Sequence, residues 1–165
     1  MRPMKRRLLL LLPPLGWLAG CASPSVATLP ARAPEVPRTD AGKRHDVVLQ
    51  ALAMLDRNYT YGGKKLHTGF DCSGLVSFVY RESAGLRLGG SSADMARLAR
   101  PVSRLEVQPG DLAFFNTLGA SFSHVGIYVG EDRFVHAENE KTGVKTSNLR
   151  SRYWSQRFEG FRTLF

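Results

Sequence analysis

The sequence predicts an α+β domain in which helices precede an antiparallel β-sheet of about five strands. Between residues 40 and 99, apolar residues recur at the spacing that is typical of helices. After Pro109 and Gly110 the pattern changes to short runs rich in β-branched and aromatic residues. Helices followed by a meander of strands pack as a helical layer against the sheet. We therefore expect a cleft along the seam between the two layers.

Three helices are expected before the change in pattern. They cover residues 40–58, residues 71 or 72 to 85, and residues 91–99. Asp40 is the expected cap of the first helix, and Gly85 is the expected stop of the second. Ser91 or Ser92 is expected to cap the third, which ends before Pro101. The glycines of YTYGGKK indicate a turn between the first two helices.

The strands are expected in the second half of the chain. Their segments read DLAFFN, HVGIYVG, RFVHAE, GVKTSN and FEGFRTLF. In the second segment, alternation places Val125 and Ile127 on one face of the sheet and His124 and Gly126 on the other. Because His124 begins the strand and Gly126 on the same face is small, the imidazole of His124 is well placed to face a cleft.

The first 20 residues are typical of a bacterial secretion signal. Basic residues precede an apolar run that is broken by Pro13 and Pro14 and is shorter than the roughly 20 residues of a membrane-spanning helix. Residues 18–21, LAGC, resemble a lipobox, in which the thiol of Cys21 is acylated with chains such as palmitate. Ala22 then favours the outer membrane, facing the periplasm. The alternative is an ordinary signal peptide with an incidental cysteine.

The remaining chain is expected to form a tether and one domain. Residues 21–39 are rich in Pro, Ala, Ser and Thr without a hydrophobic period, which is typical of disorder. Residues 40–165 are long enough for a single core. Residues 1–20 hold four basic and no acidic residues, so without them the formal net charge falls from +9 to +5, and this basic surface suits anionic envelope polymers or lipid headgroups. We expect no nucleic-acid binding, because no basic stripe with interleaved aromatics is visible.

The chain has two cysteines, Cys21 and Cys72. An acylated Cys21 cannot form a disulfide, so Cys72 would be a lone thiol in an oxidising compartment, where such a thiol is expected to be functional. Without acylation, a disulfide between the two is the alternative. The four histidines make no close sequence pair with Cys72, so we expect no zinc site, and no cofactor is implied.

Five blocks resemble, in order, those of the NlpC-type cell-wall cysteine peptidases, a bacterial branch of the papain-like fold. The blocks span nearly all of residues 45–165 and read YTYGG…GFDCSGLVSFVY, SSADM, VQPGDLAFF, SHVGIYVGEDRFVHA and RYWSQRFEGFRTLF. The resemblance implies a papain-like fold. It also implies that Cys72 is the nucleophile, that His124 is the base, and that His136 orients His124 through a hydrogen bond.

The thiol chemistry agrees with these roles. A helix N-terminus stabilises a thiolate at Cys72 by about 0.3–1 kcal/mol, or about 2 kcal/mol when partly buried. The neighbouring Asp71 carboxylate opposes this effect. The helix alone is therefore insufficient, and a histidine partner is required.

The position of His136 depends on the hairpin that precedes it. If residues 131–132 form a two-residue turn with regular pairing, Ile127 lies opposite His136, and Asn139 lies opposite His124. Strong twist, a bulge or a different loop would bring His136 to His124 instead. His136 is therefore the first candidate for the residue that orients His124, and Asn139 is the alternative.

Three further residues are expected to line the substrate site. The backbone N–H of Cys72 is the natural oxyanion donor, and Tyr59 matches a family tyrosine whose hydroxyl can assist it. Tyr59 could equally be a core aromatic. Asp71 is either a helix cap or a ligand for a cationic group. In the family, the residues that match Asp71 and Ser92 help bind the free amine of a stem peptide.

The resemblance implies a lipid-anchored peptidoglycan hydrolase in the bacterial envelope. The family's commonest target is the bond between γ-D-glutamate and diaminopimelate, so a D,L-endopeptidase is expected. Two departures from the family pattern indicate an altered substrate pocket. Met95 stands where the family often has Gln, and AENEKTG stands where the family often has a Ser-rich turn. No wall-binding repeat is visible, so a protein adaptor or regulator is a candidate partner. The alternatives are a non-hydrolytic lipoprotein that binds wall fragments or a partner, and an acyltransferase on the same fold.

Overall fold

The computed structural model describes residues 39–165. The predicted signal peptide, the acylation of Cys21 and the tether, apart from its last residue Thr39, lie outside the described residues. Within residues 39–165, no helix is both long and apolar enough to cross a membrane.

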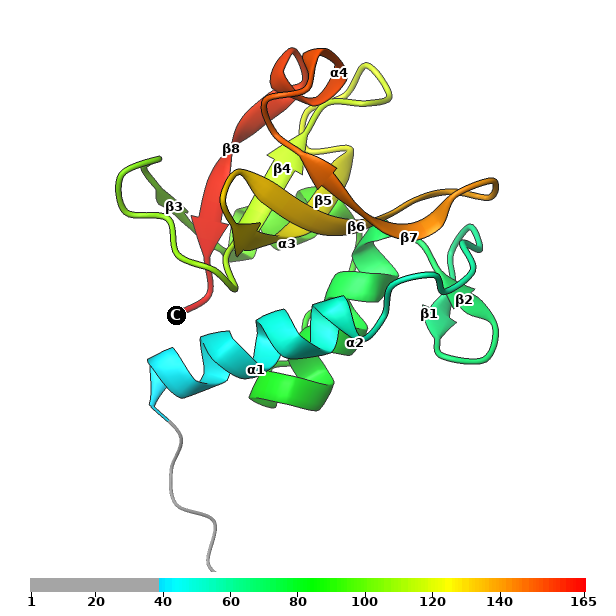
Figure 1. Ribbon diagram of the computed structural model, residues 1–165, viewed down its shortest axis with the longest axis horizontal. Helices are drawn as coiled ribbons and strands as arrows, with labels where there is room; N and C mark the ends of the chain where they lie inside the picture. Colours follow the sequence, from blue (N-terminus) through cyan, green and yellow to red (C-terminus); the bar gives the residue numbers. More distant parts are fainter. Residues whose placement is uncertain (1–38) are drawn as a thin grey trace, which may run out of the picture. The chain divides into compact units, whose positions relative to one another are not determined.

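The α+β prediction is confirmed. The helices are α1 (Asp40–Leu52), α2 (Cys72–Ala84), α3 (Ser92–Leu98) and α4 (Arg152–Ser155). The strands are β1 (Lys64–Lys65), β2 (Gly69–Phe70), β3 (Arg100–Val102), β4 (Leu112–Phe115), β5 (His124–Gly130), β6 (Arg133–Asn139), β7 (Gly143–Asn148) and β8 (Phe158–Thr163). Six strands form an antiparallel sheet in the order β3-β8-β4-β5-β6-β7, and β1 and β2 form a separate hairpin. All five expected strands are present (Figure 1).

The helix starts follow the predicted caps with one correction. Thr39, and not Asp40, caps α1, because the Thr39 Oγ1 accepts a hydrogen bond from the backbone N–H of Gly42 at 3.2 Å. Asp40 lies in the first turn, where its charge favours the helix dipole. The helix also ends at Leu52, earlier than expected, and Asp56 in the following turns has a positive φ of 64°. The starts of α2 and α3 are as predicted.

Three elements were not predicted, because each is too short for a periodic signal. They are the β1–β2 hairpin, the single-turn helix α4 and the edge strand β3. Pro101 in β3 was expected only as a helix stop, yet it pairs with Arg162 of β8. A proline is tolerated there because an edge strand need not donate every N–H to a neighbour.

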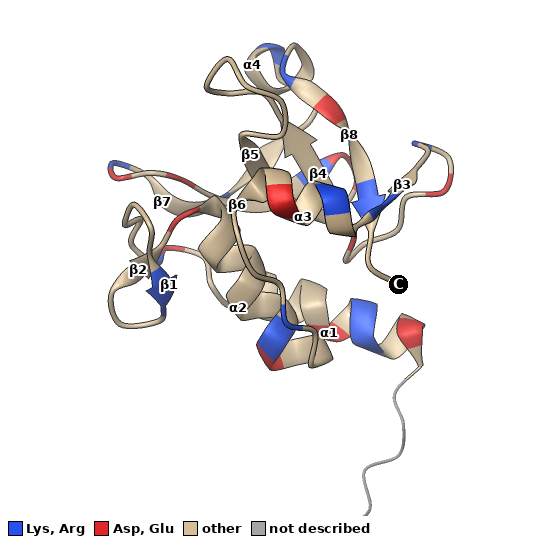
Figure 2. Ribbon diagram, turned by 180° about the vertical axis from the view of Figure 1, so that it is seen from behind, with Lys and Arg blue, Asp and Glu red and all other residues tan. Residues whose placement is uncertain are grey.

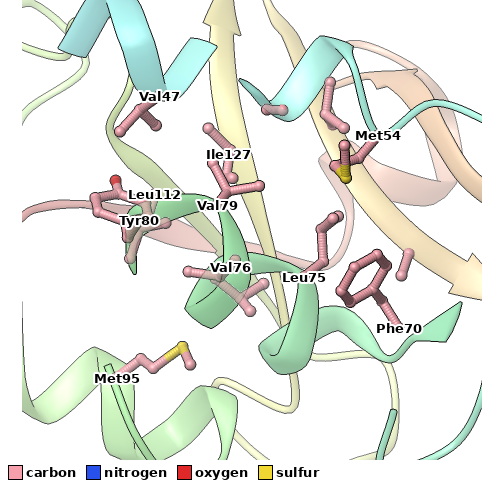
Figure 3. Packing of buried hydrophobic residues seen from close by; sticks show 14 of the residues in the cluster. Val47, Met54, Phe70, Leu75, Val76, Val79, Tyr80, Met95, Leu112 and Ile127 are labelled. Atoms are coloured by element: carbon pink, nitrogen blue, oxygen red, sulfur yellow. The ribbon is translucent and has the colours of Figure 1, made fainter. Parts of the chain in front are cut away.

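The sheet is covered on both faces by different apolar clusters. On one face, α1 and α2 pack against side chains that include Leu112, Val125 and Ile127. Figure 3 shows Val79 of α2 beside Ile127. The other face carries a second cluster, whose buried members are Ala113, Phe115, Phe134, Leu149, Trp154 and Phe161. The predicted alternation along β5 is thus confirmed, and it directs His124 toward the second cluster.

One buried ion pair joins the helical layer to the sheet. Arg44 of α1 donates to the Asp111 carboxylate at 2.6 Å and to the Thr163 hydroxyl at 2.8 Å. Asp111 is only 1% exposed, and it also accepts a hydrogen bond from the backbone N–H of Gln108. Elsewhere the charges are mixed, and α1, α3 and β8 each carry both signs (Figure 2).

A β-bulge in the β5–β6 hairpin decides where His136 lies. Gly130 pairs with Arg133, so residues 131–132 form the expected two-residue turn, and both have positive φ. The next pairs are Tyr128 with Phe134 and Ile127 with Val135, so one extra residue on β5 shifts the register. The regular register is therefore wrong by one residue. The bulge turns His136 to the face that carries His124.

Candidate active site

Cys72 is the first residue of α2, and Asp71 caps that helix. One carboxylate oxygen of Asp71 accepts hydrogen bonds from the Ser73 hydroxyl at 2.9 Å and from the Gly74 N–H at 2.6 Å. Gly74 allows the preceding turn to approach, since a Cβ at this position would lie 1.9 Å from the carbonyl oxygen of Gly63. The helix start is therefore held firmly, with the free thiol of Cys72 at its first turn.

The sulfur of Cys72 lies against the beginning of β5. The backbone N–H of Val125, the residue after His124, hydrogen-bonds to the thiol. Burial is the largest influence on this group and raises the pKa of Cys72 to about 11, and the Asp71 charge adds to the rise. The backbone N–H groups of Val125, Ser73 and Cys72 itself oppose the rise but do not cancel it.

His124, His136 and Ser147 form a chain of hydrogen-bonding groups. The Nε2 of His124 lies 2.9 Å from the Nδ1 of His136, and the Nε2 of His136 lies 2.9 Å from the Ser147 hydroxyl oxygen. His136 is fully buried, and His124 is 7% exposed. The remaining ring nitrogen of His124, Nδ1, is the one that a reacting group in the cleft would use.

Burial also governs the protonation of the two imidazoles. It lowers the pKa of His124 to about 4, although the Asp71 charge opposes this change. The pKa of His136 is lowered well below its usual value by burial, and then by His124 and Lys145. Both rings are therefore neutral near pH 7, and the Cys72 thiol keeps its proton. In this state His124 is a base that is ready to accept a proton.

Trp154 of α4 covers the two histidines. Its ring stacks on His124 with centroids 5.4 Å apart, and it meets His136 edge-on at 4.7 Å. Trp154 is itself only 6% exposed. It therefore excludes water from one side of the histidine pair and contributes to the burial that lowers both pKa values.

The predicted site residues gather around one hollow. Its lining includes Cys72, His124, Tyr59, Asp71 and Ser92. His136 lies behind His124, as the hydrogen bond between the rings requires. Asn139 lines a neighbouring hollow together with His124, Glu138 and Trp154. Among residues 39–165, no three His, Cys, Asp or Glu side chains come together as a metal site.

The polar side chains around the hollow differ in what they contact. Burial raises the pKa of the Tyr59 hydroxyl, and Cys72 and Asp71, which line the same hollow, raise it further. The hydroxyl of Ser92 donates to the carbonyl of Phe122 at 2.6 Å. The side-chain oxygen of Asn139 accepts from two backbone N–H groups of the following turn.

Sequence reasoning missed Ser147, Trp154, Glu138 and Lys64. The last two bring opposite charges to the lining of the hollow. Alternation along GVKTSN would have placed Ser147 on one face, but only the shifted register of the preceding hairpin shows which residue it meets. Trp154 had no signal beyond its place in the RYWSQRFEGFRTLF block.

Comparisons with known proteins identify the family of this chain. The sequence model of the NlpC/P60 family matches residues 56–163. Murein DD-endopeptidase MepH of Escherichia coli K12 is 34% identical over 114 residues, which cover 67% of this chain and 42% of MepH. Gamma-DL-glutamyl hydrolase of Bacillus subtilis 168 is 35% identical over 117 residues, which cover 70% of this chain and 28% of the hydrolase.

A solved structure of the same family has a similar fold. An NLP/P60-family protein from Staphylococcus aureus Mu50, described as similar to lipoprotein, superimposes with a TM-score of 0.67 at 33% identity. The match covers 78% of this chain and 43% of the Staphylococcus protein. The matched part of the chain thus spans less than half the length of these three relatives.

Proposed function

The chain belongs to the NlpC/P60 family, and from this premise we propose that it is a cysteine peptidase that hydrolyses amide bonds in the stem peptides of peptidoglycan. The observation that carries the proposal is the placement of Cys72 and His124 in one hollow, with the far nitrogen of His124 hydrogen-bonded to His136. The names of the two sequence relatives, an endopeptidase of murein and a glutamyl hydrolase, support the substrate class.

The first half of the reaction forms an acyl-enzyme. The Nδ1 of His124 takes the thiol proton as the sulfur of Cys72 attacks the carbonyl carbon. His136 accepts a hydrogen bond from the Nε2–H of His124 and so stabilises the imidazolium that forms. The backbone N–H of Cys72, at the start of α2, and the hydroxyl of Tyr59 face the negative oxygen of the tetrahedral intermediate.

The second half releases the products. His124 donates its proton to the leaving amine as the tetrahedral intermediate collapses to a thioester on Cys72. Water then attacks the thioester carbonyl while His124 accepts a proton from it. The second tetrahedral intermediate then expels the Cys72 thiolate, which takes that proton from His124, and this returns the neutral resting pair.

For the bond that is cut, we favour the link between γ-D-glutamate and diaminopimelate. Asp71 uses one carboxylate oxygen to cap α2, so the other remains for a cationic group of the stem peptide. Ser92 lines the same hollow. Its hydroxyl donates to Phe122, so Ser92 would meet the amine as a hydrogen-bond acceptor.

For location, we propose a lipid anchor at Cys21 in the outer membrane, facing the periplasm, with a protein adaptor or regulator that positions the enzyme. The support for this is the sequence of the first 39 residues.

Digestion of purified muropeptides tests the activity. The purified protein and its Cys72→Ala variant are incubated with the same muropeptides, and mass spectrometry identifies the products. New fragments from the wild-type protein alone would support hydrolysis, and their masses would identify the bond. If the Cys72→Ala protein cuts equally well, the thiol mechanism is wrong. If neither protein cuts and a thiol reagent does not label Cys72, the non-hydrolytic alternative replaces the peptidase.

A further inference from the structure

We propose that Ser147 is a positioning residue for the thiol chemistry. Its hydroxyl oxygen accepts a hydrogen bond from the Nε2–H of His136, and this bond stabilises the tautomer in which His124 presents an unprotonated Nδ1 to Cys72. The inference deepens the proposed function and rests on it for its catalytic meaning. The hydrogen-bond arrangement itself can be measured without any activity.

The contacts leave His136 little freedom. Both of its ring nitrogens lie 2.9 Å from a polar atom, Nδ1 from His124 and Nε2 from Ser147. The ring is fully buried, so bulk water cannot replace either partner. Ser147 pairs with Phe134 across the β6–β7 ladder, and this register turns its side chain to the face that carries His136.

A neutral imidazole carries one proton on its two ring nitrogens, so the hydrogen bond between Ser147 and His136 is linked to the protonation of Nδ1 on His124. If His136 carries its proton on Nε2, its Nδ1 accepts from the Nε2–H of His124, and the Nδ1 of His124 is left unprotonated. If His136 carries its proton on Nδ1 instead, it donates to the Nε2 of His124. The proton of His124 must then sit on its Nδ1, where it blocks uptake of the thiol proton.

The reactive arrangement needs an acceptor beside the Nε2 of His136. A serine hydroxyl supplies this acceptor, because its own proton can rotate toward the partly exposed side of β7. This acceptor is still required after proton transfer, because a doubly protonated His124 must donate to the Nδ1 of His136, which leaves the proton of His136 on its Nε2. Burial, and then the nearby His124 and Lys145, lower the pKa of His136 and so disfavour a second proton on that ring.

Three variants separate positioning from a general structural role. Ser147→Ala removes the acceptor, Ser147→Thr keeps a hydroxyl at the same place, and Thr146→Ala removes a hydroxyl from the opposite face of β7. We expect Ser147→Ala to lower kcat about 10-fold or more with little change in KM, because a buried donor loses its partner. Ser147→Thr should restore most of the rate, and Thr146→Ala should leave it unchanged.

The tautomers are read directly by NMR of protein labelled with ¹⁵N-histidine, at a pH near 7. The wild-type spectrum should show an unprotonated Nδ1 on both His124 and His136, and Ser147→Ala should shift His136 toward protonation at Nδ1. A protonated Nδ1 on His124 in the wild-type protein would overturn the proposal, even if Ser147→Ala fails to fold. Unchanged tautomers in a folded Ser147→Ala protein would also overturn it.

The two proposals can fail separately. If the wild-type protein cleaves no muropeptide but the tautomers respond to Ser147 as expected, the proposed substrate is wrong and the positioning role stands. If cleavage is normal and Ser147→Ala retains the full kcat, the peptidase stands and the role of Ser147 is refuted.

Discussion

Gly126 of β5 packs directly against His136 of β6. A Cβ at position 126 would lie 3.2 Å from the Cβ of His136 and 2.5 Å from the Cδ2 of Phe134. Phe134 is fully buried and touches the His136 ring, so neither neighbour can retreat freely. The approach of the two strands that brings His136 to His124 therefore depends on the absence of a side chain at position 126.

Gly126→Ala should therefore impair both stability and activity. Overpacking of this kind costs about 1–3 kcal/mol, and displacement of His136 should lower kcat about 10-fold or more by weakening its bond to His124. Urea unfolding and muropeptide cleavage measure the two effects. Gly89→Ala is the matched control, since a Cβ there meets nothing within 4 Å. Full activity of Gly126→Ala would contradict this packing argument.

The same hairpin shows what the sequence could and could not predict. Local signals placed Cys72 at a helix start and His124 at a strand start, and the structure confirms both positions. Their catalytic roles were predicted from the family resemblance. The bulge that repositions His136 was left open by the sequence, because a regular two-residue turn and a bulged hairpin both fit the residues around positions 131–132. Ser147 depends on two successive registers, and Trp154 lies on a helix of only four residues. Such relationships follow from tertiary contacts.

The reactivity of Cys72 toward iodoacetamide should increase steadily with pH. With a pKa of about 11, the thiolate fraction rises about tenfold per pH unit between pH 7 and pH 10. Asp71 raises this pKa, so Asp71→Asn should lower it and speed labelling near pH 8, while asparagine can still cap α2. Labelling rates followed by mass spectrometry measure both effects. A wild-type rate that reaches a plateau below pH 8 would show instead that the thiol is already ionised.

The acid limit of the activity should lie near pH 4. His124 must be neutral to act as the base, and burial lowers its pKa to about 4, so kcat/KM should fall only as the pH drops through that value. Trp154→Ala would admit water to the histidine pair and raise the pKa of His124 toward its usual value of about 6.5. The acid limit of this variant should therefore move upward, whereas Trp154→Phe should shift it less. Initial rates between pH 3.5 and pH 8 decide the matter, and an identical acid limit in all three proteins would mean that Trp154 does not shield the ring.

The ion pair between Arg44 and Asp111 should contribute to stability far more than an exposed pair does. Arg44→Ala would leave the Asp111 carboxylate buried without its cationic partner, which costs about 3–5 kcal/mol. Arg81→Ala is the matched control, because it breaks an exposed pair with Glu82 at 2.8 Å and should cost less than about 1 kcal/mol. Urea unfolding at pH 7 measures both changes in the free energy of unfolding. Since Arg44 joins α1 to the sheet and lies outside the residues that line the Cys72 hollow, the folded Arg44→Ala protein should keep a normal kcat at low temperature. Equal losses of stability in the two variants would show that burial of Asp111 does not govern this contact.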